Sequence, residues 1–124
     1  MRSEGVRRRH HDLEVWRDSL DLVEAVYRAT SSFPHDERFG LTAQLRRAAV
    51  SVPSNIAEGA ARRSRPELMQ FLYIARGSLA EIETQLQIAR RLGYLAEDAS
   101  LDALLNRVLA KLGALLKALK DKTP

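Results

Sequence analysis

The feature that most constrains the fold of this 124-residue chain is the stretch over residues 40–59. Its apolar residues recur at spacings of three and four, the period of one helical face, and are Leu41, Leu45, Ala48, Ala49, Val52 and Ile56. Pro53 lies inside the stretch, where a proline removes a backbone hydrogen bond and bends a helix. Because the apolar spacing continues in phase past Pro53, we expect one bent helix. Two short helices, broken at Pro53, are the alternative.

A second row in the same stretch is polar and has the same spacing: Gln44, Arg47, Ser51, Ser54 or Asn55, and Glu58. A shorter polar row, Ser78, Glu81 and Gln85, follows in the next apolar segment. Because buried polar groups need partners, we expect the two rows to face each other or a neighbouring subunit. The functional alternative is that Arg46, Arg47 and Arg76 line a groove or pore and bind phosphate.

Three other segments repeat apolar residues at the helical period, and we expect helices over residues 12–30, 65–92 and 97–120. The helix that contains Pro53 is expected to start between residues 36 and 41 and to end at or shortly after residue 59. The main stripe of the first helix is Leu13, Trp16, Leu20, Val23 and Tyr27, widened by Val15, Leu22 and Val26. Short links such as residues 61–64 join antiparallel neighbours. The sequence therefore predicts an all-α, antiparallel up-down-up-down four-helix bundle.

Local signals mark several helix ends. Ser64 and Glu67 have the spacing of a capping box, in which each side chain bonds the backbone amide of the other. Asp36 is a candidate N-cap for the second helix, and Gly93 is a natural C-cap for the third. Gly77 costs the third helix roughly 1 kcal/mol relative to alanine. We expect a closely approaching helix to justify that cost.

Composition bounds the domain organisation and the class of partner. The length suits one domain, which we place over residues 11–122, after a basic arm over residues 1–10 that we expect to be flexible. The absence of cysteine excludes disulfides, thiolate catalysis and cysteine-ligated zinc. We find no secretory signal or membrane span and expect a cytoplasmic protein. The net charge of +4 permits a polyanionic partner without demanding one.

The chain has few residues arranged for chemistry. A di-metal bundle site needs Glu-x-x-His pairs, which do not occur, and the histidines His10, His11 and His35 fall in the arm or a loop. Arg47, Glu58 and Glu81 suit either a buried acid–base set or a structural ion-pair network, of which the network is the commoner arrangement. We expect no enzymatic activity, metal, cofactor or small-molecule substrate, and no concave pocket with convergent polar groups.

Several runs resemble the small four-helix bundle protein family, which is also known for proteins encoded in intervening sequences of bacterial 23S ribosomal RNA genes. The runs are LEVW at residues 13–16, FP at 33–34, ERFGLT at 37–42, QLRRA at 44–48, SVPSNIAEG at 51–59, FL at 71–72 and GSLAE at 77–81. The chain is also similar to the accessory proteins of diversity-generating retroelements. The match covers about residues 11–120.

The resemblance implies a homopentameric ring of bundles with a basic surface that associates with nucleic acid. In the retroelement relatives such a ring contacts a reverse transcriptase and RNA. The family supplies no established catalytic residues. Our leading hypothesis is a non-enzymatic ring that binds RNA or DNA by phosphate neutralisation, without base readout. The candidate nucleic-acid-binding residues are Arg46, Arg47, Arg62, Arg63, Arg65, Arg76, Arg90 and Arg91.

A scaffold that binds only itself and a protein partner is the alternative. The apolar surface of the first and third helices is broader than one thin bundle can bury, which favours a protein interface. Arginines paired with acids would support this scaffold, whereas a continuous unpaired basic patch would support nucleic-acid binding.

Overall fold

The structure, a computed structural model, describes residues 7–122. This part of the chain is all-helical, with no strand. Its elements are the 3₁₀ turn η1 (Arg9–Asp12), α1 (Glu14–Thr30), the 3₁₀ turn η2 (His35–Glu37), α2 (Leu41–Ala60), α3 (Arg65–Arg91) and α4 (Ala99–Asp121). The predicted all-α fold with four long helices is therefore confirmed. Residues 1–6 of the predicted flexible arm lie outside the described residues.

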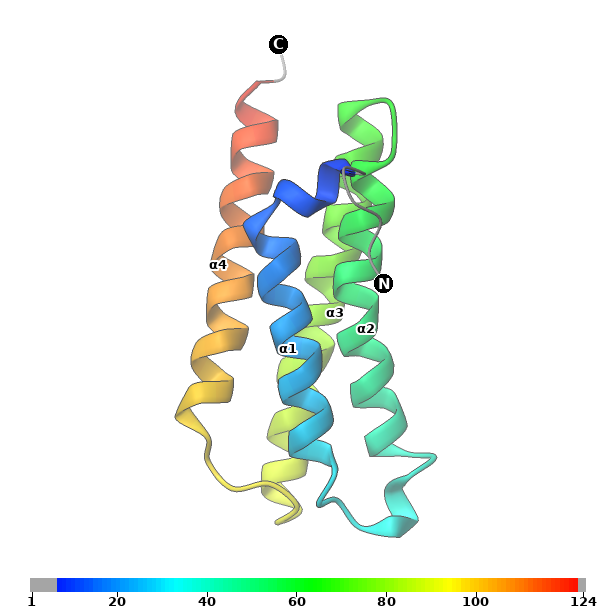
Figure 1. The fold of residues 1–124 in the computed structure, drawn as a ribbon. Helices are drawn as coiled ribbons and strands as arrows, with labels where there is room; N and C mark the ends of the chain where they lie inside the picture. Colours follow the sequence, from blue (N-terminus) through cyan, green and yellow to red (C-terminus); the bar gives the residue numbers. More distant parts are fainter. Residues whose placement is uncertain (1–6, 123–124) are drawn as a thin grey trace.

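Each long helix packs against two others: α1 and α3 both contact α2 and α4. In Figure 1 the chain descends through α1, rises through α2, descends through α3 and rises through α4. The 3₁₀ turn η1, the α2–α3 turn and the end of α4 lie together at the top of the view, which we call the upper end. The α1–α2 and α3–α4 connections lie at the lower end.

The face that α1 buries differs from the main stripe predicted for it. Val15, Leu22 and Val26 are buried, together with Ser19, which is completely inaccessible. Leu20 and Tyr27, from the predicted stripe, are 38% and 42% exposed. Ser19 can be buried because its hydroxyl donates a 2.6 Å hydrogen bond to the Trp16 carbonyl. The side chains predicted only to widen the stripe therefore form the core.

The second helix continues through Pro53, which is buried inside it, so the alternative of a break at this residue is wrong. The prediction of Asp36 as N-cap is also wrong, because Asp36 lies in η2, before the α2 N-cap residue Gly40. Gly40 has no side chain to accept a hydrogen bond. The Leu41 amide instead donates to the Glu37 carboxylate at 3.1 Å.

At the start of α3, Ser64 accepts a hydrogen bond from the Glu67 amide at 3.3 Å, as predicted. The reciprocal half of the capping box is different, because the Ser64 hydroxyl donates to the Glu67 carboxylate at 2.9 Å.

Nearby, α2 and α3 approach closely at Gly59. A Cβ atom there would lie 2.8 Å from the Phe71 Cβ and 3.1 Å from the Leu68 carbonyl oxygen. Only glycine fits this crossing without displacing α3.

The end of α3 confirms the predicted role of Gly93. Gly93 has a φ of +78°, the left-handed conformation that glycine adopts without strain. Its amide bonds the Arg90 carbonyl at 3.0 Å, and the Tyr94 amide bonds the Ala89 carbonyl at 2.9 Å, which is a Schellman motif. The expectation for Gly77 is not met within residues 7–122, because nothing lies within 4 Å of a Cβ placed there.

Candidate nucleic-acid interface

The structure brings only some of the predicted arginines together. Arg62, Arg63 and Arg65 flank the α2–α3 turn at the upper end. Arg46 and Arg47 lie near the start of α2, toward the lower end, and Arg91 is the last residue of α3. These arginines therefore do not form one continuous patch on a single chain.

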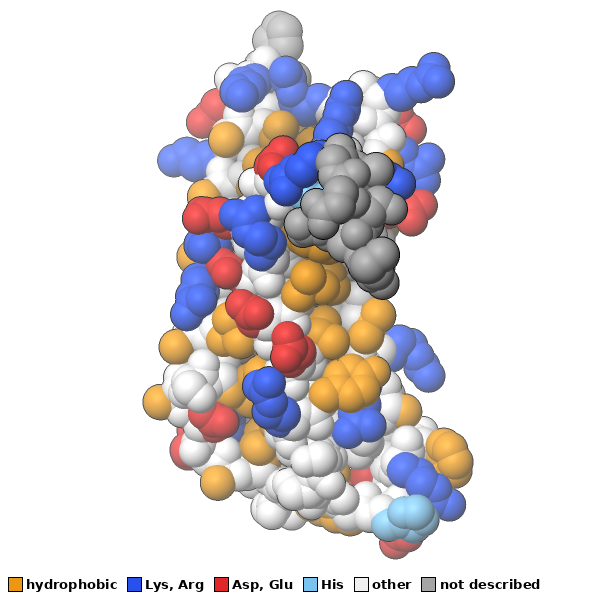
Figure 2. Space-filling view, viewed as in Figure 1, with side chains coloured by type: hydrophobic (Ala, Val, Ile, Leu, Met, Phe, Trp, Pro, Cys, Tyr) orange, Lys and Arg blue, Asp and Glu red, His pale blue; other side chains and the backbone are white. Residues whose placement is uncertain are grey.

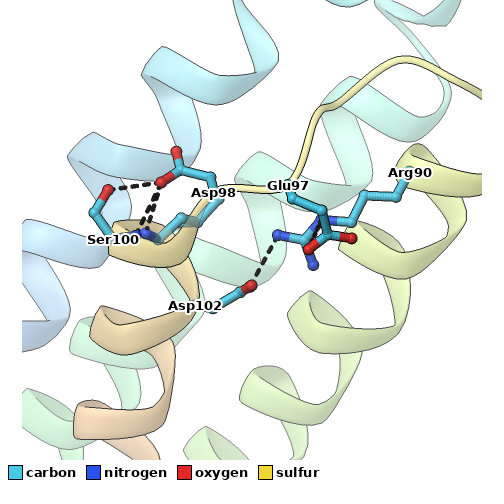
Figure 3. Close-up of polar contacts among 6 residues, drawn as sticks. Arg90, Glu97, Asp98, Ser100 and Asp102 are labelled. Carbon is cyan, nitrogen blue, oxygen red and sulfur yellow. Dashed lines mark hydrogen bonds and ion pairs between the residues drawn. The ribbon is translucent and has the colours of Figure 1, made fainter.

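Arg90 is engaged within the bundle (Figure 3). Its guanidinium extends from α3 to the start of α4, 2.9 Å from an Asp102 oxygen and 4.0 Å from a Glu97 oxygen. Its side chain is only 9% exposed. An arginine that is buried and paired with carboxylates offers little to a phosphate, so Arg90 serves the α3–α4 contact.

The first turn of α4 beside this pair is capped by Asp98, whose carboxylate accepts from the Ser100 and Leu101 amides at 3.0 and 3.1 Å. The Ser100 hydroxyl donates to the same oxygen at 2.7 Å. The hydrogen bond from Ser100, followed by that from the Leu101 amide, lowers the pKa of Asp98. The cap therefore stays ionised at neutral pH and stabilises the positive end of the helix.

Arg46 is fixed against the end of α1. Its Nε donates to the Thr30 hydroxyl at 2.9 Å, and its guanidinium lies 4.5 Å from the centre of the Tyr27 ring. Arg47 and Arg91 are exposed, and neither side chain has a hydrogen bond or ion pair with any other residue in the range 7–122. Arg76 is also exposed and lies 4.8 Å from the Tyr73 ring centre. These last three arginines are open to an external anion.

The predicted buried set of Arg47, Glu58 and Glu81 does not form. All three residues are exposed, and Glu58 pairs with Arg62 at 3.1 Å instead. The two polar rows are bonded where the Ser51 hydroxyl donates to the Ser78 hydroxyl, and Gln44 of the first row lines the same hollow as Glu81 and Gln85 of the second. The rows therefore contact each other without placing an acid or a base in a protected site.

A cavity of about 310 Å³ opens at the upper end, and we call it the upper pocket. Most of the side chains that line it are of two kinds: the arginines Arg9, Arg62, Arg63 and Arg65, and the leucines Leu13, Leu68, Leu115 and Leu119. Gly59, Ala60 and Ser64 complete the lining. No described residue lining it is acidic. Figure 2 shows Lys and Arg side chains gathered at this end of the bundle. The expectation that no concave pocket with convergent polar groups would exist is therefore wrong.

Most arginines of the upper pocket are held in place by bonds that leave donors available. Arg65 donates to the Lys122 carbonyl at 3.0 Å, and Arg9 to the Arg62 carbonyl at 3.5 Å. Arg62 lies 4.8 Å from the Phe71 ring centre, in addition to its ion pair with Glu58. Arg63 is exposed and unpaired within the described chain. Arg9 was not among the predicted binding residues, since periodicity gives no sign that η1 folds against α2.

Two other hollows on the bundle carry both signs of charge. One of about 610 Å³ between α1 and α4 contains Asp21, Glu24 and Arg28, and one of about 250 Å³ contains Arg90, Glu97 and Asp102. Within residues 7–122 no three His, Asp or Glu side chains converge as a metal site would require. None of the described helices has an apolar stretch long enough to cross a bilayer.

The family model of the 23S rRNA-intervening sequence protein matches residues 11–116. The chain belongs to this family. No curated protein matches it. The matched range of the 23S rRNA-intervening sequence protein family includes Arg62, Arg63 and Arg65 but ends before Lys117 and starts after Arg9. It is not a known enzyme family.

Proposed function

We propose that this chain forms a non-enzymatic, homopentameric ring of up-down-up-down bundles that binds RNA or DNA in the cytoplasm. The observation that carries the proposal is the cluster of Arg62, Arg63 and Arg65 at the upper end, which lines a cavity with no acidic residue among its described lining. Arginines bind phosphate through a planar fork of N–H donors. Affinity gained in this way comes from contacts with the phosphates of the nucleic acid and is independent of base sequence.

Two different apolar surfaces support the ring. The first surface comprises Leu20, Tyr27 and Val50 on α1 and α2, where Figure 2 shows hydrophobic side chains on the face toward the viewer. The second surface comprises Tyr73, Ile74, Ile88 and Leu92 on and just after α3. A chain with two distinct interfaces associates head to tail and closes into a ring when the rotation allows. The number of five subunits comes from the family resemblance.

Two features beside the second surface also suit a neighbouring subunit. Gln85 is 9% exposed, and its side-chain oxygen has no hydrogen-bond partner in the described chain. Gln85 lines a hollow of about 340 Å³ together with Gly77, where a Cβ atom would meet nothing within 4 Å. A side chain from the next subunit would fill the hollow, which justifies the glycine within α3.

A salt titration of binding to mixed-sequence RNA tests the nucleic-acid role. We expect affinity to fall steeply with salt, because each neutralised phosphate releases counterions. The triple variant Arg62→Gln, Arg63→Gln, Arg65→Gln should reduce the slope of log affinity against log salt by about 2 for single-stranded RNA. The matched control is Arg28→Gln with Arg107→Gln, which removes charge near the α1–α4 hollow. Salt-independent binding, or an equal loss in the control, would contradict the proposal.

The scaffold function is a second candidate, because several predicted binding arginines are engaged within the chain. Arg46 contacts Thr30, Arg62 pairs with Glu58, and Arg90 pairs with Asp102. A ring that forms in solution but does not bind RNA at low salt would favour the scaffold. Association with a reverse transcriptase, which the retroelement resemblance implies, is tested by co-purification with an enzyme encoded beside this chain.

A further inference from the structure

The upper pocket combines two kinds of wall that bind different parts of a ligand. Leu13, Leu68, Leu115 and Leu119 supply apolar surface, and four guanidinium groups supply positive charge. The volume of about 310 Å³ is at the small end of the range of ligand sites, which is roughly 300–1,000 Å³. Such a cavity suits one small molecule with an apolar body and an anionic head.

The charge of the pocket distinguishes it from the other hollows. The α1–α4 hollow and the hollow at Arg90 each contain carboxylates that neutralise their arginines. The upper pocket has no acidic residue among its described lining, and the Glu58 that pairs with Arg62 at 3.1 Å is 55% exposed and not among the lining residues. An anion that entered the pocket would therefore meet attraction without a competing carboxylate in the wall.

Arg65 is held in place yet retains free donors, which is the condition for binding an anion at little entropic cost. Arg65 uses one N–H for the Lys122 carbonyl, and a guanidinium has five. The Arg63 side chain has no hydrogen-bond or ion-pair partner within residues 7–122, and it lines the same pocket as Arg65, near the positive end of the α3 dipole. Two guanidinium forks that line one pocket can bind the oxygens of a terminal phosphate.

We propose that the upper pocket binds a phosphate monoester attached to an apolar or aromatic body. The phosphate lies on Arg63 and Arg65, and the body lies on the leucines of α3 and α4. A mononucleotide and an alkyl phosphate share this chemistry. The site goes beyond the proposed function, because a small ligand can occupy it whether or not the ring binds a nucleic-acid strand.

Titration of the full chain with phenyl phosphate and, separately, with inorganic phosphate tests the proposal by calorimetry and amide NMR. Burial of the phenyl ring on the leucines should make phenyl phosphate bind at least about tenfold more tightly. The shifted amides should include those of residues 61–65, of Glu67 and Leu68, and of Leu115. Equal affinity for the two probes, or shifts confined to the α1–α4 hollow, would overturn the proposal. Adenosine 5′-monophosphate and octyl phosphate, compared in the same way, identify which body the pocket prefers.

Two variants test separately how the pocket binds the phosphate and how it binds the apolar group of the ligand. The double variant Arg63→Gln, Arg65→Gln should bind phenyl phosphate at least about tenfold more weakly, because charge-assisted hydrogen bonds are lost. Leu119→Ala should lower the affinity for phenyl phosphate but leave the affinity for inorganic phosphate unchanged. Arg91→Gln, an exposed arginine at the other end of α3, is the control and should change neither. Unchanged binding in both pocket variants would overturn the proposal.

The same variants distinguish this inference from the nucleic-acid role. Leu119→Ala keeps every arginine, so its binding to mixed-sequence RNA should match that of the unaltered chain. Binding of phenyl phosphate by a chain that does not bind RNA contradicts only the proposed function. Binding of RNA by a chain that does not distinguish phenyl phosphate from inorganic phosphate contradicts only the pocket.

Discussion

The hydroxyl of Tyr94 donates a 3.1 Å hydrogen bond to Glu37, whose other carboxylate oxygen accepts the Leu41 amide at 3.1 Å. One carboxylate thus joins the loop after α3 to the start of α2 and supplies the cap that Gly40 lacks. The Phe33 ring, 5.8 Å from the Tyr94 ring centre, packs beside this bond. The hydrogen bond to Glu37 raises the pKa of Tyr94, because it favours the protonated phenol.

Glu37→Ala should destabilise the bundle more than Tyr94→Phe. The alanine variant loses the helix cap as well as the loop contact, and a lost cap costs about 1 kcal/mol. The phenylalanine variant loses only the hydroxyl and keeps the ring against Phe33. Urea unfolding followed by circular dichroism measures both. If Tyr94→Phe proved the more damaging change, Glu37 would not be the cap of α2.

Gly59→Ala should destabilise the chain by about 1 to 3 kcal/mol, the usual cost of overpacking a close contact. The added Cβ would lie 3.1 Å from the Leu68 carbonyl oxygen, a backbone atom that cannot rotate away. Gly113→Ala in α4 is the control, since a Cβ there meets nothing within 4 Å. The midpoint temperature of thermal unfolding should fall for Gly59→Ala and rise slightly for Gly113→Ala. A higher midpoint temperature for both variants would mean that α2 and α3 do not need glycine at their crossing.

The contact between η1 and α1 should loosen in acid. The His10 ring lies 4.7 Å from the Trp16 ring, and burial, then repulsion from His11 and Arg8, lower the pKa of His10 below 6.5. A base with a lowered folded pKa stabilises the fold fully above 6.5, and this contribution is lost as the pH falls through the folded pKa. Trp16 is the only tryptophan, so its fluorescence should report a transition below pH 6.5.

The control for this transition is His35→Gln, which should leave the fluorescence change intact because His35 lies in η2 at the other end of the bundle. His10→Gln should abolish it. Persistence of the full change in His10→Gln would show that another group governs the contact.

Asp102→Ala should destabilise the α3–α4 contact by about 1 to 3 kcal/mol, because it leaves the largely buried Arg90 guanidinium without its 2.9 Å partner. The remaining acid, Glu97, is 4.0 Å from Arg90 and 85% exposed, so it compensates little. Chemical unfolding measures the loss. Asp121→Ala, an exposed acid in the last turn of α4, is the control and should change stability by less than about 0.5 kcal/mol.

Ile74→Glu should disperse the proposed ring while the helices remain folded, because Ile74 is 49% exposed on the single chain. A charge placed in an apolar interface loses its hydration without gaining a partner. Light-scattering mass should fall, with unchanged circular dichroism. Ala103→Glu on the exposed side of α4 should leave the mass unchanged. A monomeric mass for the unaltered chain would contradict the ring.

The parts of the fold that depend on local chemistry were predictable from the sequence. Ser64 before the third helix and Gly93 after it signal their own geometry within a few residues, so both ends of α3 were placed within one residue. The face that α1 buries was not predictable, because Val15 and Leu20 lie in two adjacent apolar stripes and periodicity does not say which faces the axis. The difference in burial between Val15 and Leu20 arises only from the positions of α2 and α4.

The candidate site was less predictable for the same reason. Arg90 and Arg91 are adjacent in the sequence, yet one is paired with Asp102 and the other is open to solvent. Nothing in their local sequence distinguishes them, because the partner of Arg90 comes from the next helix. Arg9 likewise joins the upper pocket only because η1 folds against α2.

The close crossing at Gly59 also bears on the order in which the chain folds. The four residues between α2 and α3 close a short loop, which costs less entropy than the connections that bring α1 and α4 together. The α2–α3 pair also has the most extensive contact of any two helices in the described chain. We therefore expect this hairpin to form the folding nucleus, so that Gly59→Ala slows folding, whereas Leu112→Ala in α4 mainly accelerates unfolding.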